Sequence, residues 1–327
     1  MSGSASPVPA SPDRRGRAAR WVIVIAAIYV VALCYVDRDR NVLSRLADMA
    51  APLGVCTLLV LLSYLLRYLR WRSILRAQGF LLPQWRQGLL AYLAGFAFTA
   101  SPGKAGELLR IRYFGWLDVP ARSTLSSFIF ERAIDLLIIT LLAVGAAALV
   151  PIFGVLAMII LLVLLGLVAF ACWPPLARAS RRAIDLVPGS PLRRLGHFLI
   201  DGAGALGLLM RPGLLTTSCG WGAGAWGLTA MAFAWLCHAS GIDLPWPLAL
   251  GIYPLAMLVG ALSFVPGGVG TTEASIVVML NAGGVDTNAA LAIAIGIRLV
   301  SLWLAVLVGV LAMAILESSG SSARQSH

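Results

Sequence analysis

Charged residues interrupt the apolar stretches of this chain at a few places, and these residues have the greatest capacity for chemistry. One stretch contains Glu131, Arg132 and Asp135. Glu131 and Asp135 are four residues apart and would share a helix face, while Arg132 and Asp135, three apart, can pair. Because charges inside a membrane are costly and rarely retained without a role, we interpret Glu131 and Asp135 as proton-coupling or charge-balancing groups.

Four more charged residues, Lys104, Glu107, Glu273 and Arg298, lie in or near other apolar segments. If the chain brings them together with Arg132, the lysine and the two arginines could bind a phosphate or phosphodiester, since the planar guanidinium fork matches its oxygens. Glu107 and Glu273 would offset the positive charge when the site is empty. The alternative is that all these charges form buried ion pairs that fix helix packing.

The same sequence offers little for other chemistries. Five cysteines without a C-x-x-C pair, and histidines that stand apart, predict no metal site and no disulfide framework. We expect no cofactor and no catalytic residue. The net charge of +11 first suggests nucleic acid, but the arginines cluster at the ends of apolar runs, where orientation signals lie. We therefore predict no nucleic-acid partner.

The elements that must position these charges are membrane helices. The chain is 60% hydrophobic and only 12% charged, whereas soluble domains carry about 25% charged residues. Six runs approach or exceed the roughly 18 to 20 apolar residues that cross a bilayer as a helix. We predict an all-α polytopic membrane protein with about six full spans, at 21–36, 50–66, 124–150, 152–173, 216–239 and 291–316.

Two further apolar segments are broken by proline and glycine. The first, 87–100, is too short to span the membrane and runs into a turn at 101–107 before a second arm ends near Trp116. The second, 247–264, breaks at 265–270 and continues with a short arm at 272–281. We predict two re-entrant hairpins of opposite orientation. Their turn residues are Pro102, Gly103, Gly106, Pro266, Gly267, Gly268 and Gly270.

The two breaks have matching surroundings. Each has a Pro-Gly step followed by a glutamate, and 25 residues separate Glu107 from Arg132 as they separate Glu273 from Arg298. This predicts an inverted repeat, with one copy at about 50–150 and the other at about 216–316. Inverted repeats with broken helices meeting near the midplane are typical of secondary transporters.

Basic residues predict the orientation. Residues 1–18 form a basic tail that we expect to be disordered, 19–316 form a single membrane domain, and 317–327 form a polar C-terminal tail. The arginine-rich connector 174–212 is predicted to be cytoplasmic, as are both termini. The arginines after the second span support the same side, and they are Arg67, Arg70, Arg72 and Arg76.

Three blocks resemble the lysylphosphatidylglycerol synthase transmembrane-region family, also called flippase-like. They are SPGKAGELLR at 101–110, FERAIDLL at 130–137 and FVPGGVGTTEAS at 264–275. The resemblance implies a domain of the bacterial inner membrane that moves a charged lipid between leaflets, in a stand-alone form without the aminoacyl-transferase domain. It implies functional roles for the turn residues, for Glu107, Glu131, Arg132, Asp135 and Glu273, and for Arg110. A functional role for Arg298 is inferred from the predicted repeat and not from one of these blocks.

The leading hypothesis is a lipid flippase or scramblase with a membrane lipid as its substrate. The cargo would be a phospholipid, an aminoacyl-phospholipid or a polyprenyl-phosphate carrier. One alternative is an intramembrane enzyme that uses Glu131 and Asp135 as acid and base on a lipid-linked phosphate or sugar. Another is a non-transporting scaffold for a lipid or glycan synthase, which would then be the partner.

Overall fold

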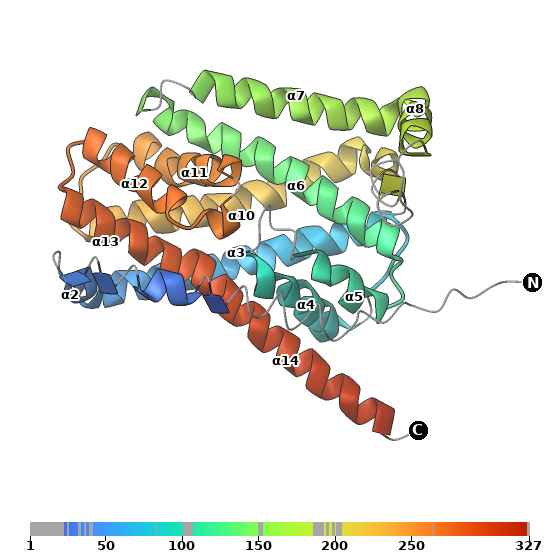
Figure 1. Cartoon of the computed structure of the whole chain (residues 1–327), viewed down its shortest axis with the longest axis horizontal. Helices are drawn as coiled ribbons and strands as arrows, with labels where there is room; N and C mark the ends of the chain where they lie inside the picture. Colours follow the sequence, from blue (N-terminus) through green and yellow to red (C-terminus); the bar gives the residue numbers. More distant parts are fainter. Residues whose placement is uncertain are drawn as a thin grey trace, which may run out of the picture.

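The protein is an all-α polytopic membrane protein. Its computed structural model describes residues 42–82, 84–100, 107–149, 153–185, 205–263 and 265–325, with scattered positions in 23–38 and 193–200. Every regular element in these ranges is a helix, and the described positions of the first predicted span, 21–36, are helical as well (Figure 1). The elements are α2 (Val42–Asp48), α3 (Ala50–Ala77), α4 (Trp85–Ala94), η1 (Gly95–Phe98), α5 (Arg110–Gly115), α6 (Ala121–Ala143), η3 (Val144–Leu149), α7 (Phe153–Cys172), α8 (Pro174–Asp185), η4 (Ala205–Leu209), α10 (Pro212–Ala239), α11 (Trp246–Leu262), η5 (Pro266–Gly268), α12 (Thr271–Ala282), α13 (Thr287–Arg298), η6 (Leu299–Trp303) and α14 (Leu304–Gln325).

Within the described residues, four helical stretches are long and apolar enough to cross a membrane. They are Ala50–Ala77, Ala121–Leu149, Phe153–Phe170 and Thr287–Ser319. Helix α10 has 28 residues, as α3 does, but glycine and tryptophan make it less apolar. At about 1.5 Å per residue its length still exceeds the roughly 30 Å of a bilayer core.

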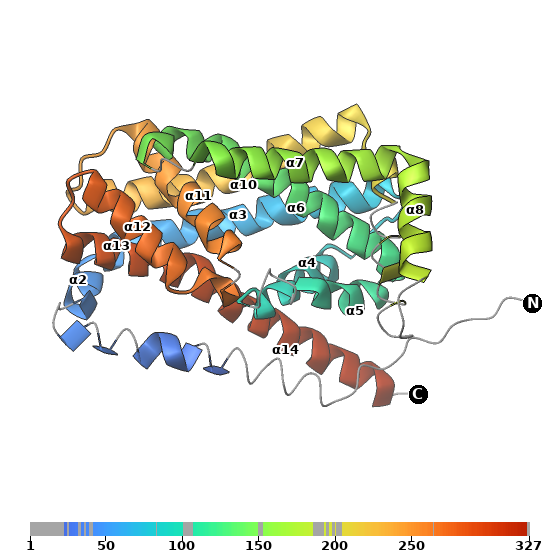
Figure 2. The same ribbon diagram turned by 45° about the horizontal axis from the view of Figure 1, so that its top comes forward.

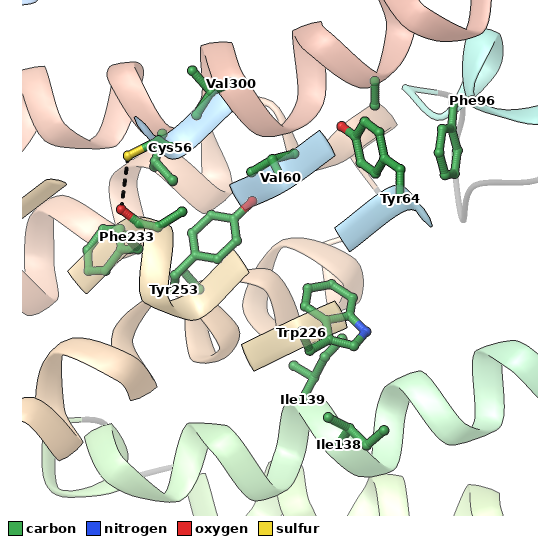
Figure 3. Close-up of a cluster of buried hydrophobic side chains, with 14 of the residues drawn as sticks. Cys56, Val60, Tyr64, Phe96, Ile138, Ile139, Trp226, Phe233, Tyr253 and Val300 are labelled. Atoms are coloured by element: carbon green, nitrogen blue, oxygen red, sulfur yellow. Dashed lines mark hydrogen bonds between the residues drawn. The ribbon is translucent and has the colours of Figure 1, made fainter. Parts of the chain in front are cut away.

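Helices α3 and α10 pack along each other through the middle of the bundle. The thiol of Cys56 on α3 donates a hydrogen bond to the Ala232 carbonyl oxygen at 3.1 Å, which places the two backbones close together. Figure 3 shows this core, where Tyr64, Trp226 and Tyr253 gather from three different helices. The charged site lies next to this aromatic layer.

The two predicted hairpins correspond to pairs of short helices. Helices α4 and α5 pack against each other on either side of residues 101–106, which lie outside the described residues. Helices α11 and α12 also pack together and are joined by the short helical turn η5. In Figures 1 and 2 the first pair opens toward the end of the molecule that holds α8, and the second pair opens toward the opposite end.

Each broken segment packs against the long helix of the other half of the chain. Helix α4 and η1 contact α14, whereas α11 contacts α6 and η3. Glycines allow both approaches, because a Cβ at Gly309 would overlap the backbone of Ala97 and a Cβ at Gly145 would overlap the Pro247 carbonyl. Each half of the chain therefore contributes a broken segment that packs against a long helix of the other half.

The last long helix changes its winding directly after Arg298. Residues Leu299–Trp303 form one turn of π-helix, which leaves backbone groups without their usual partners. The hydroxyl of Tyr64 donates to the carbonyl oxygen of Ser301 at 3.0 Å, and Tyr253 donates to its side-chain oxygen at 2.9 Å. Tyrosines from α3 and α11 thus stabilise the widened turn.

Candidate functional site

Two carboxylates on α6 face an arginine on α3. The Arg70 Nη2 atom donates to Glu131 Oε1 at 3.0 Å and to Asp135 Oδ1 at 2.7 Å. The side chains of Arg70 and Glu131 are fully buried and that of Asp135 nearly so. The spacing of four residues presents both carboxylates on one helix face, as the sequence predicts, but their main partner comes from another helix.

A second arginine reaches Glu131 from α5. The Arg110 Nη1 atom donates to Glu131 Oε2 at 3.0 Å, and its Nη2 atom lies 3.5 Å from Glu107 Oε2. Its guanidinium lies 3.9 Å from the ring centre of Tyr92, whose hydroxyl donates to Glu131 Oε1 at 2.7 Å. Arg110 is 1% exposed, so it belongs to this buried network and does not extend toward lipid headgroups.

Arg132 and Arg67 complete the cluster on its open side. Arg132 pairs with Asp135 at 3.0 Å and approaches Glu107 at 3.6 Å. Arg67 lies 3.5 Å from Asp135 and covers the ring of Trp226, 4.3 Å from its centre. We call the group of seven charged side chains the α6 cluster. Its members are Arg67, Arg70, Arg110, Arg132, Glu107, Glu131 and Asp135.

A simpler pair, which we call the α13 pair, stands on the other half of the chain. The Arg298 Nε atom donates to Glu273 Oε1 at 3.0 Å. The other oxygen of Glu273 accepts from the Gly270 backbone N–H at 2.8 Å and so caps α12, while Arg298 Nη2 donates to the Gly267 carbonyl oxygen. Arg298 on α13 therefore links the last long helical stretch to the turn between α11 and α12.

The α6 cluster and the α13 pair face one cavity of about 80 Å³. Arg67, Glu107 and Arg132 line it from the first half, and Gly267 and Arg298 line it from the second. The two broken segments meet here, since a Cβ at Gly267 would lie 3.2 Å from the Ala100 Cα atom. The cavity is lined further by Ser63, Tyr64, Phe96, Thr99, Trp226, Thr229, Tyr253, Met257 and Ser301.

The predicted site residues are largely brought together. Glu107 lies 3.6 Å from Arg132, and Glu273 lies 3.0 Å from Arg298. The two sequence spacings of 25 residues therefore correspond to two matched contacts. Lys104, Pro102, Gly103 and Gly106 lie outside the described residues.

One part of the orientation argument is wrong. Arg67 and Arg70 do not follow the second span, because α3 continues to Ala77 and buries both side chains within the bundle. The apolar run ends at Leu66, but the buried aromatic residues Tyr68 and Trp71 continue the helix. This alternation of arginine with buried aromatic residues is the signal that could have located the two missed site residues.

The cluster has an unusual charge balance for a buried site. Four arginines face three carboxylates, an excess of one positive charge among the described residues. Buried charge of this kind is normally paired, so the excess favours an anion as the ligand. In the part of the chain that the structure describes, no group of three or more His, Cys, Asp or Glu side chains could hold a metal ion.

Fold and site together define a polytopic membrane protein with an arginine-rich cavity between two broken helices. The family model for the lysylphosphatidylglycerol synthase TM region matches residues 18–309. The chain therefore belongs to this family, and its membrane-lipid-related role follows from that membership. No curated protein matches the chain.

Proposed function

We propose that the protein moves a phosphate-bearing lipid between the two leaflets, as a flippase or scramblase. The observation that carries this proposal is the shared cavity, which arginines from both halves of the chain line together. A phosphate or phosphodiester would occupy the cavity while the acyl chains remain in the surrounding lipid. Guanidinium groups bind such oxygens with directed, charge-assisted hydrogen bonds.

The proposed arrangement in the membrane would provide an access path from each side. We infer that α4–α5 and α11–α12 are re-entrant hairpins in an inverted repeat, since they open toward opposite ends of the molecule and meet at the cavity. Interrupted helices at membrane depth need burial in protein or contact with a water-filled cavity. The arginine-rich end with α8 and the end of α14 would face the cytoplasm of a bacterial inner membrane.

Each site residue then receives a role. Arg132 and Arg298, together with Lys104 from the first turn, would bind the phosphate. Glu107 and Glu273 would orient these arginines. Glu131 and Asp135 would balance the charge of Arg70 and Arg110, because both carboxylates already accept hydrogen bonds from arginine. The same contacts make them unsuitable as a general acid and base, which disfavours the intramembrane enzyme.

The cavity is too small for a complete headgroup in this conformation. Its volume of about 80 Å³ suits a few water molecules, whereas pockets for small molecules measure roughly 300–1,000 Å³. Lipid entry would therefore require the hairpins to separate. Their contact at Ala100 and Gly267 is the point that must open.

Reconstituted vesicles test the proposal. With fluorescent phospholipid, the unmodified protein should accelerate loss of label to a reductant outside, and Arg132→Ala and Arg298→Ala should each slow this at least about tenfold. Arg112→Ala is the matched control, because Arg112 pairs with Glu317 outside the cavity at 3.3 Å. Movement at the unmodified rate in both cavity variants would refute the proposal.

A non-transporting scaffold is the second candidate, favoured by the complete burial of Arg70 and Glu131. In that case the charges serve stability alone. Arg298→Ala should then lower the thermal unfolding temperature in detergent, and the unmodified protein itself should not move lipid. A folded variant that no longer moves lipid would exclude the scaffold.

A further inference from the structure

A second cavity, of about 430 Å³, lies where α10 ends and α11 begins. Among the described residues, it shares no lining residue with the cavity between the two broken segments. The connection that forms it lies at the end of the molecule opposite α8 (Figures 1 and 2). Its volume falls within the roughly 300–1,000 Å³ of pockets for small molecules, so a ligand could enter it without a change of the fold.

Apolar and aromatic side chains form much of the wall of this cavity. The buried Ala234 on α10 and Ala249 on α11 form its inner part. The indole of Trp246 is 53% exposed, and its centre lies 6.4 Å from the centre of the His238 ring. Proline residues precede and follow Trp246, and they restrict the backbone that carries the indole. The cavity therefore combines an apolar interior with an accessible aromatic face.

The charge at this cavity is negative. Asp243 lines it with an exposed carboxylate, which has no ion-pair or hydrogen-bond partner among the residues that the structure describes. The chain has no lysine or arginine between residues 212 and 297. A neighbouring loop adds the carboxylate of Asp286, since a Cβ at Gly283 would lie 3.4 Å from the Leu244 side chain. This surrounding contrasts with the arginines that line the other cavity.

The two helix ends at the cavity act on a charged ligand in opposite directions. The C-terminal end of α10 is the negative end of a 28-residue helix dipole, which favours a cation. The N-terminal end of α11 would favour an anion, but Pro247 in its first turn has no N–H group to donate. With the Asp243 carboxylate beside both ends, the balance favours a positively charged ligand.

An organic cation fits these features better than a metal ion does. Cys237, His238 and Asp243 all line the cavity, yet no group of three or more His, Cys, Asp or Glu in the described part of the chain could hold a metal. A substituted ammonium group can pair with a carboxylate while its carbon atoms pack on the face of an indole. The apolar interior would then receive the rest of the molecule.

We propose that this cavity binds an organic ammonium group, with the Asp243 carboxylate and the Trp246 ring as its main contacts. The site is additional to the proposed lipid path and does not depend on it. The ammonium group could belong to a free small amine or to a lipid headgroup, because both offer the same chemistry.

Saturation-transfer NMR with choline tests the site in detergent micelles that contain no ammonium group. We expect choline to bind the unmodified protein, and Asp243→Asn and Trp246→Leu each to weaken its affinity at least about tenfold, because each removes one of the two main contacts. Asp185→Asn is the matched control and should bind choline unchanged, since Asp185 is a 59% exposed carboxylate that pairs with His197. Both cavity side chains are exposed, so the variants should retain the unfolding temperature of the unmodified protein.

Two results would overturn the proposal. One is the absence of choline binding to the unmodified protein. The other is an affinity for choline that Asp243→Asn leaves unchanged.

Competition against bound choline distinguishes the two sources of the ammonium group. Short-chain phosphatidylcholine should displace choline at a lower concentration than unlabelled choline does if the ligand is a lipid headgroup, and at an equal or higher concentration if it is a free amine. Glycerol phosphate is the competitor of opposite charge and should displace nothing. Displacement by glycerol phosphate as effective as that by choline would assign the cavity to anions and overturn the proposal.

Discussion

The two halves of the chain build the same contact in different surroundings. In each half a glutamate after a broken helix pairs with an arginine 25 residues later, Glu107 with Arg132 and Glu273 with Arg298. In the first half this pair belongs to seven charges, whereas in the second, among the described residues, it has no further charged partner and contacts the backbone of the turn. The halves therefore share this contact but differ in the charge around it, and we expect the first half to depend more strongly on its buried carboxylates.

This comparison predicts unequal costs when one carboxylate is neutralised. Glu131→Gln leaves Arg70 and Arg110 without a full counter-charge in a buried site, so we expect a loss of roughly 3–5 kcal/mol in unfolding free energy. Glu273→Gln affects one arginine and should cost less. Chemical denaturation in detergent micelles measures both losses, and a larger loss for Glu273→Gln would contradict this comparison of the two halves.

Two glycine-to-alanine substitutions distinguish the cost of crowding the contact between the broken segments from the cost of backbone strain. Gly267 has a φ of 64° and lies against Ala100, while Gly241 has a φ of 76° and nothing near its Cβ direction. An alanine at either position should cost roughly 1–2 kcal/mol for the left-handed backbone. Gly267→Ala should cost more than Gly241→Ala because Ala100 must also move. Equal losses would mean that the segments do not meet as closely as we describe.

We expect the smallest effect on stability from a substitution outside the α6 cluster and the α13 pair. Arg112 and Glu317 form an ion pair whose side chains are 29% and 38% exposed. Exposed ion pairs contribute about 0–1 kcal/mol. Arg112→Gln should therefore change the thermal unfolding temperature little and leave lipid movement intact. A loss of stability as large as that of Glu131→Gln would show that burial does not explain the difference between these ion pairs.

Much of this arrangement is readable in the sequence. Apolar length predicts the long spans, Pro-Gly steps predict the breaks, and the equal spacing of 25 residues predicts two contacts that do form. Arg67 and Arg70 are easily missed, because an arginine at the end of an apolar run resembles an orientation signal, and only the alternation with Tyr68 and Trp71 indicates that the helix continues. The partner Asp135 lies 65 residues after Arg70, and only the packing of α3 against α6 brings them together.

Arg110 illustrates the same limit. Its position at the beginning of a short helix is equally compatible with a lipid-facing side chain. The stacking on Tyr92 and the ion pair with Glu131 arise only when α4, α5 and α6 are packed. Sequence spacing predicts contacts within one helix well, but contacts between helices depend on the tertiary arrangement.

The most direct test joins the two broken segments. In a background without the five native cysteines, Ala100→Cys with Gly267→Cys should form a disulfide, since the two Cβ positions are 3.4 Å apart, close to the roughly 3.5–4.5 Å of natural disulfides. Intact mass confirms the bond, and Ala100→Cys with Gly241→Cys is the control pair. We predict that oxidation stops lipid movement and that reduction restores it. If the cross-linked protein moves lipid as fast as the same protein with its disulfide reduced, the result would contradict the account.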